Sequence, residues 1–130
     1  MRGQTIDQAI EFLAGSFREA GKIAGDHGIL ACFEIEPVFV FNTAEHYVRI
    51  LQGANQPNLK GIYDPSHFDQ MNGRTCKPEE LLARVGVENI GYLQFCDTDG
   101  TLLDAGTSTH LGCGDGKTDC TRALRMFKQG

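Results

Sequence analysis

The stretch Leu59-Lys60-Gly61-Ile62-Tyr63-Asp64-Pro65-Ser66-His67 has the pattern of a short buried strand that ends in an acid, a proline and a histidine. Turn-forming residues flank its apolar part, which is too short for a helix. Because proline cannot donate a ladder hydrogen bond, the strand is predicted to end at Asp64. A carboxylate at that end, with the imidazole of His67 three residues later, is how an α/β protein presents a metal ligand or a catalytic base.

Helical and strand-like patterns alternate along the rest of the chain. Apolar spacing, capping residues and turn signals predict four helices, at residues 5–24, 42–52, 78–86 and 119–130, and two further strands, at residues 29–36 and 90–96. Loops are predicted over residues 68–76 and 98–116, and the second loop is longer than ordinary connections, which favours a functional role. Helices between strands predict parallel pairing with right-handed crossovers.

Three polar residues are predicted to share one rim of the sheet. Glu36, Asp64 and Gln94 each lie at or near the carboxyl end of a predicted strand, 28 and 30 residues apart, which is one strand–helix unit each. This spacing is typical of a (β/α)8 TIM barrel, which usually needs about 250 residues. We therefore predict an α/β fold in one domain, residues 1–130: a partial (β/α)8 TIM barrel with about three parallel strands and four helices.

A partial barrel would expose two sheet edges and an apolar inner face, and both promote association. We therefore expect either the rest of a barrel or a second copy of the chain to cover them, or the chain to be a piece of a longer protein. The sequence ends at a predicted helix with no strand after it, which favours the piece.

Composition restricts the classes of function and partner. The net charge of −5 argues against nucleic acid as a partner, which requires clustered basic residues. No apolar run approaches the ~20 residues of a membrane span, and the amino terminus lacks the apolar segment of a secretory signal. The five cysteines are an odd number with no C-x-x-C pair, and we interpret them as reduced thiols of a cytoplasmic protein.

Four motifs occur in an order that resembles a known family. They are Phe33-Glu34-Ile35-Glu36-Pro37, Ile62-Tyr63-Asp64-Pro65-Ser66-His67, Tyr92-Leu93-Gln94-Phe95-Cys96-Asp97 and His110-Leu111-Gly112-Cys113-Gly114-Asp115-Gly116. Their order and spacing resemble the xylose isomerase-like TIM-barrel superfamily, which includes sugar phosphate isomerases and epimerases, ketose 3-epimerases and endonuclease IV. The resemblance covers nearly the whole chain and falls on that family's carboxyl-terminal half, without the last strand.

The resemblance implies one divalent cation at the barrel rim, often Mn²⁺, Mg²⁺, Co²⁺ or Zn²⁺, held by a Glu, an Asp, a His and a second Glu. Carried onto this chain, it implies metal ligation by Glu36, Asp64 and Gln94, the last at a position where many members have His. His67 matches a motif histidine that helps to hold the site, and the second Glu has no counterpart here. Carboxylate and amide oxygens favour Mn²⁺ or Mg²⁺ over metals that prefer thiolates.

Each of these residues also has a purely structural alternative. Glu36 could cap a loop, and Glu34, on the same face of the strand, could exchange roles with it. Asp64 could form an Asx turn, and Gln94 could be a buried, hydrogen-bonded amide. His110, in the long loop, could contact a substrate oxygen or a second metal, or it could be solvated.

The function that the resemblance implies is a divalent-metal-dependent isomerase or epimerase of a small sugar or polyol derivative. Glu36 would remove the proton next to the substrate carbonyl, and the family's second Glu would return it, so this chain alone is expected to be inactive. A lyase or dehydratase of the same fold is an alternative, because dehydroshikimate dehydratase-like members have Gln at the position of Gln94. A nuclease is disfavoured by the small number of histidines and the negative charge, and a non-catalytic half-barrel that associates is a further alternative.

Overall fold

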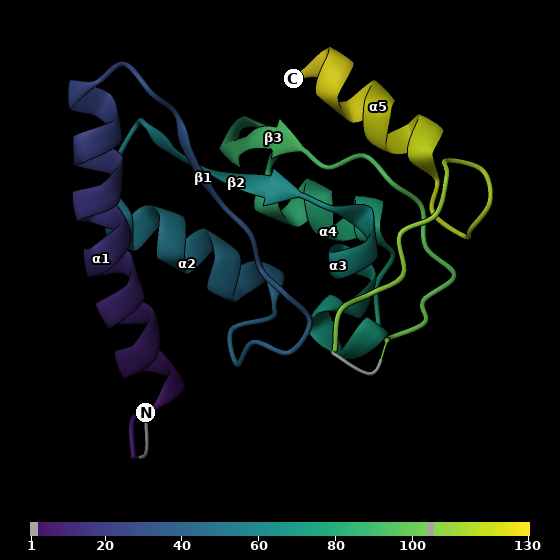
Figure 1. The fold of residues 1–130 in the computed structure, drawn as a ribbon, viewed down its shortest axis with the longest axis horizontal. Coiled ribbons are helices and arrows are strands. Elements are labelled where there is room, and N and C mark those ends of the chain that lie inside the picture. Colours follow the sequence, from purple (N-terminus) through teal and green to yellow (C-terminus); the bar gives the residue numbers. More distant parts are fainter. Residues whose placement is uncertain (1–2, 104–105) are drawn as a thin grey trace.

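The computed structural model describes residues 3–103 and 106–130. Three strands, β1 (Ala31–Phe33), β2 (Leu59–Tyr63) and β3 (Ile90–Leu93), form one parallel sheet in the order β1-β2-β3 (Figure 1). The helices are α1 (Ile6–Asp26), α2 (Ala44–Ala54), α3 (Pro65–Gln70), α4 (Pro78–Val85) and α5 (Cys120–Gln129), with short 3-10 helices at Met71–Arg74 and Val87–Asn89. The three parallel strands confirm the predicted partial TIM-barrel arrangement.

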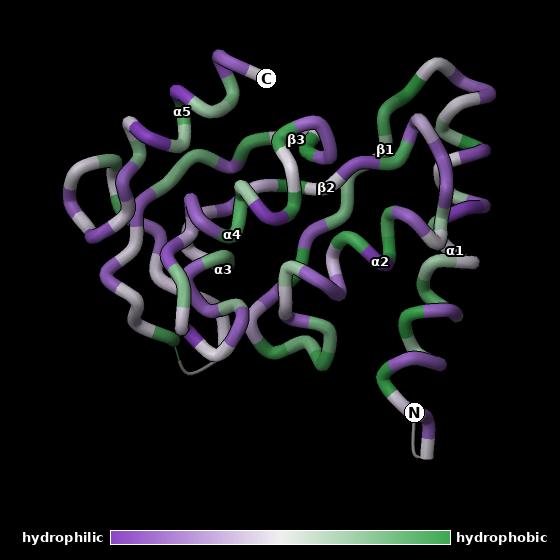
Figure 2. The backbone as a smooth tube through the Cα atoms, turned by 180° about the vertical axis from the view of Figure 1, so that it is seen from behind, coloured by the Kyte–Doolittle hydropathy of each residue, from purple (hydrophilic) through white to green (hydrophobic). Residues whose placement is uncertain are grey.

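Side-chain caps set the starts of the predicted helices. At α1, the Thr5 hydroxyl accepts the Gln8 backbone N–H and the Gln8 side chain accepts the Thr5 N–H, which together form a capping box. At α2 and α5 the side chains of Thr43 and Asp119 accept the backbone N–H groups of His46 and Arg122, which caps each helix without a reciprocal bond. Figure 2 shows hydrophobic residues recurring between hydrophilic ones along α1 and α2, as expected for helices with one buried face.

The predicted loop over residues 68–76 is wrong, because α3 and the 3-10 helix Met71–Arg74 occupy most of it. α3 begins directly after Asp64, whose carboxylate accepts the backbone N–H groups of Ser66 and His67 at 2.8 and 3.3 Å. Pro65 is the first helical residue, where a missing N–H costs no hydrogen bond. The residues assigned to a turn therefore cap a helix, and the chain has five α-helices among the described residues instead of four.

β1 and β3 are shorter than predicted, ending at Phe33 and Leu93 instead of at residues 36 and 96. Both pair with the central strand β2, which ends at Tyr63 because α3 follows at once. Without β2 as a hydrogen-bonding partner, neither neighbour can extend its ladder. One further bond remains, from the Gln94 N–H to the Tyr63 carbonyl at 3.0 Å.

The two faces of the sheet differ in what covers them. A methyl group added to Gly61 of β2 would overlap the hydroxyl of Tyr47, so this face meets α2, and the same hydroxyl donates to the Ile62 carbonyl at 2.7 Å. The opposite face carries the half-buried Lys60 and Ile62 and, paired with Ile62, Tyr92, which is 58% exposed. In the described part of the chain no helix covers this second face, which corresponds to the inside of a barrel.

The five cysteines are all free thiols, as predicted. Within residues 3–103 and 106–130, no helix is both long enough and apolar enough to cross a membrane.

Candidate metal centre

Carboxylates and imidazoles converge just beyond the carboxyl ends of β1 and β2. Glu34 and Glu36 follow β1, whereas Asp64 follows β2 and caps α3, whose first turn carries His67. His110 approaches from the long loop after β3. The structure therefore brings together four of the five predicted site residues, together with Glu34, which the sequence left as an alternative to Glu36.

His67 lies between the two glutamates. Its Nδ1 is 3.5 Å from Glu34 Oε1, and its Nε2 is 3.6 Å from Glu36 Oε2 and 4.0 Å from Asp64 Oδ2. Its side chain is only 3% exposed, yet neither ring nitrogen has a hydrogen-bond partner among residues 3–103 and 106–130, and the same holds for Glu34 Oε1. Buried polar atoms are nearly always partnered, so these atoms are candidates for binding a ligand.

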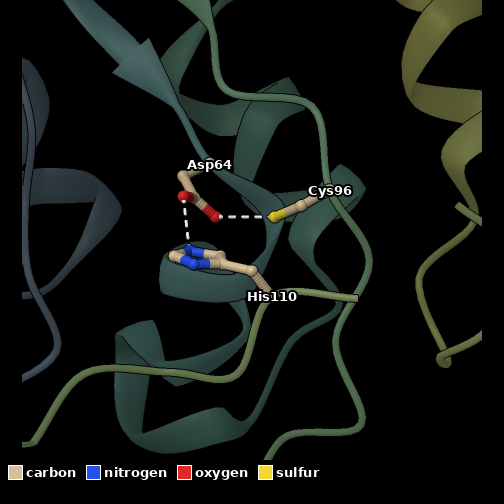
Figure 3. A group of neighbouring side chains, drawn as sticks. All are labelled: Asp64, Cys96 and His110. Atoms are coloured by element: carbon tan, nitrogen blue, oxygen red, sulfur yellow. Dashed lines mark hydrogen bonds and ion pairs between the residues drawn. The ribbon is translucent and has the colours of Figure 1, made fainter. Parts of the chain in front are cut away.

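The two oxygens of Asp64 have different partners. Oδ1 accepts from the Ser66 hydroxyl at 2.6 Å, in addition to the backbone of α3. Figure 3 shows the two other contacts: Oδ1 accepts from the Cys96 thiol at 3.3 Å, and Oδ2 is 3.0 Å from His110 Nε2. Burial raises the pKa of Asp64, but the hydrogen bonds from Ser66 and Cys96 and the nearby His67 outweigh it and hold that pKa below its usual value. Asp64 is thus a buried, charged carboxylate that both caps α3 and faces the cluster.

Cys96 is a member of the cluster that the sequence did not assign to it. Burial, followed by the charge of Asp64, raises the pKa of the Cys96 thiol to about 12, so the thiol stays protonated and donates to the carboxylate. The sequence predicted Cys96 as a small hydrophobe inside a strand. Cys96 lies two residues after Gln94, which places both side chains on one face of the predicted strand. This shared face was the sequence feature that could have assigned Cys96 to the cluster.

Gln94 lies beside Asp64 along the sheet, because Leu93 pairs with Tyr63. Its side chain is exposed, so the alternative of a buried amide is wrong. Among the described residues, the Gln94 side chain forms no hydrogen bond to the cluster.

The separations within the cluster are close to those between ligands of one ion. Atoms that share one ion at about 2.1 Å lie about 3.0–3.4 Å from one another. His110 Nε2 lies 3.0 Å from Asp64 Oδ2, within this range, and the separations from His67 are slightly longer, at 3.5–4.0 Å. Burial, followed by the charges of Asp64 and Glu36, raises the pKa of Glu34 despite His67, which indicates an excess of negative charge that a cation would offset. Within the described part of the chain, two groups could hold a metal ion: Glu34, Glu36 and His67, and Asp64, Cys96 and His110.

The loop that carries His110 is anchored by Asp97, which is fully buried. Its carboxylate accepts four backbone N–H groups at 2.8–3.0 Å, from Thr98, Gly114, Gly116 and Thr118. Burial raises the pKa of Asp97, but these four bonds outweigh it and lower the pKa to about 2. The turn that Asp97 forms positions the segment that reaches Asp64.

A family model described as "Xylose isomerase-like TIM barrel" matches residues 1–130, the whole chain. No curated protein matches the sequence.

Proposed function

Because the chain belongs to the xylose isomerase-like TIM-barrel family, we propose that it provides the metal-binding rim of an isomerase or epimerase acting on a small sugar or polyol derivative. The observation that supports this most strongly is His67: a buried imidazole, unpartnered among residues 3–103 and 106–130, with carboxylates facing both of its nitrogens. The family covers sugar isomerases and epimerases, and the cluster occupies the carboxyl ends of the strands, where TIM-barrel active sites lie.

The proposed ligands of the divalent cation are Glu36, Asp64 and Gln94, with His67 beside them and His110 contacting Asp64 from the loop. Glu36 and Asp64 are supported by the separations from His67. Gln94 would contribute its amide oxygen only after its exposed side chain turns toward the site. Oxygen ligands of this kind suit Mn²⁺ or Mg²⁺. When bound, such an ion polarises the carbonyl and hydroxyl oxygens of a sugar.

Glu36 is the proposed base. Its side chain is 35% exposed, so a substrate can reach it, whereas the Asp64 side chain is 1% exposed and its Oδ1 is occupied by hydrogen bonds. A carboxylate at the rim removes the proton from the carbon next to the carbonyl, and a partner acid returns it to another face or another carbon. We propose that this partner acid comes from outside the chain.

The uncovered sheet face gives the proposed macromolecular partner. Leu30 and Tyr92 expose 47% and 58% of their surface there. A methyl group added to Gly91 would meet Leu30, Lys60 and Cys32, so these side chains share that face. Apolar surface of this kind is normally covered. We propose that the rest of a barrel, or a second copy of the chain, covers it and completes the substrate pocket.

The reaction can be tested in deuterated water with the protein in the form that occurs in its cells, supplied with Mn²⁺ and a panel of ketoses and aldoses. We expect epimer or aldose–ketose exchange with deuterium entering the carbon next to the carbonyl, and we expect Glu36→Gln to abolish both. Glu45→Gln, an exposed glutamate in the first turn of α2, is the matched control and should keep full activity. Product that forms without deuterium from the solvent would contradict the proton-transfer mechanism, and loss of water from the substrate would assign a lyase instead.

A further inference from the structure

We propose that Ser108, acting through Ser66, is a positioning residue that fixes the orientation of the Asp64 carboxylate toward the bound cation. The inference rests on the proposed function. It assigns to Ser108, in the loop after β3, a role in orienting a ligand of the cation.

Three buried side chains form a continuous relay. The Ser108 hydroxyl donates to the Ser66 hydroxyl at 2.7 Å, and the Ser66 hydroxyl donates to Asp64 Oδ1 at 2.6 Å. Ser108, Ser66 and Asp64 are 1%, 0% and 1% exposed, so water cannot readily replace either bond. The Ser66 oxygen accepts the proton of Ser108, and a hydroxyl has only one proton of its own. The Ser66 proton is therefore directed at Asp64.

The relay leaves one oxygen of Asp64 available. Oδ1 already accepts from the Ser66 N–H, the Ser66 hydroxyl, the His67 N–H and the Cys96 thiol, which exceeds the two lone pairs of a single oxygen. A cation can therefore reach only Oδ2. Asp64 should accordingly bind the ion through one oxygen, and the direction of that oxygen depends on what holds Oδ1.

The loop contacts Asp64 from both sides. Ser108 reaches Oδ1 through Ser66, and His110, two residues later, lies 3.0 Å from Oδ2. The backbone between them is held in an antiparallel pair, because Ser108 bridges to Leu102 and Leu111 bridges to Asp97. Partners that orient a metal-binding carboxylate are known to set metal affinity as well as geometry.

The test is a double-mutant cycle of Ser108→Ala and Ser66→Ala in the full chain. Calorimetry measures the affinity of each variant for Mn²⁺. Ser108→Ala should weaken Mn²⁺ binding about fivefold, the effect of one buried hydrogen bond. Ser66→Ala should weaken it about tenfold, as loss of a direct partner of a metal ligand does. The double variant should bind no more weakly than Ser66→Ala alone, because Ser108 acts only through Ser66.

Thr98→Val is the matched control. It removes another fully buried hydroxyl from the same loop, one that accepts from the Gly100 N–H and does not contact Asp64. Thermal unfolding of all variants measures the structural cost separately. The relay is overturned if Ser108→Ala binds Mn²⁺ as the wild type does, if Thr98→Val weakens binding as much, or if the two serine effects add. A wild-type chain that binds no Mn²⁺ would instead overturn the proposed function itself, and the relay with it.

Discussion

Replacing His67 with Phe is expected to abolish the stabilisation of the chain by Mn²⁺ while leaving the metal-free chain at least as stable as the wild type. The ring of His67 is buried, and neither of its nitrogens has a partner among residues 3–103 and 106–130, so an apolar ring of similar shape removes two unsatisfied polar atoms. A ligand that binds only the folded state at a hundred times its Kd stabilises by about 2.7 kcal/mol. Thermal unfolding with and without Mn²⁺ measures both effects.

His46→Phe is the control for this substitution. His46 lies on α2, and its Nδ1 is likewise buried and unpartnered among the described residues, but it is not part of the cluster. We expect the His46 variant to keep the full response to Mn²⁺. A His67→Phe variant that still gains stability from Mn²⁺ would show that the imidazole does not help to hold the ion. A large loss of metal-free stability would show that His67 has a structural role instead.

Replacing Asp97 with Asn is expected to destabilise the chain by about 3 kcal/mol, because at least one pair of backbone N–H groups then faces an amide N–H₂ and loses its acceptor. Asp97 is fully buried and accepts four such groups, so no rotation of the amide can satisfy them all. Because this carboxylate anchors the loop that carries Ser108 and His110, Mn²⁺ binding should weaken as well. Urea unfolding and calorimetry measure the two losses.

The same substitution should change the acid limb of the stability curve. The pKa of Asp97 in the folded chain is about 2, below its ordinary value of 3.8, so its stabilising effect is complete above pH 4 and is lost as the pH falls toward 2. The wild type should therefore lose stability over this range more steeply than Asp97→Asn. Asp99→Asn, an exposed neighbour in the same loop, is the control and should cost much less. Equal losses from both variants would contradict the anchoring role of Asp97.

Much of the fold could be predicted from periodicity and caps. The rim positions Glu36 and Asp64 followed from strand ends spaced by one strand–helix unit, and Thr5 and Asp119 cap their helices as expected. The clearest miss was α3, because Asp64-Pro65 is typical of a turn and also of a helix start, and local sequence does not choose between them. Whether a turn or a helix follows Asp64 matters for the site, because α3 directs His67 toward Glu34 and Glu36.

The contacts of the site could be predicted only in part. Cys96 and Ser108 reach the cluster through the long loop and the end of β3, and irregular backbone has no period from which a direction can be read. The sequence left Glu34 and Glu36 as alternatives, and the structure places both carboxylates next to His67. For Gln94, the position beside Asp64 along the sheet could be predicted, but the exposure of its side chain could not.

The most direct test of the metal centre is nuclear magnetic resonance of the histidine side chains during addition of Mn²⁺ at less than one equivalent. The chain has four histidines, and two of them, His27 and His46, lie outside the cluster. Because paramagnetic broadening falls steeply with distance, the imidazole signals of His67 and His110 should broaden first and most, and Mg²⁺ in excess should restore them. Broadening that begins at His27 or His46, or that is absent at His67, would contradict a divalent cation between the carboxylates at this rim.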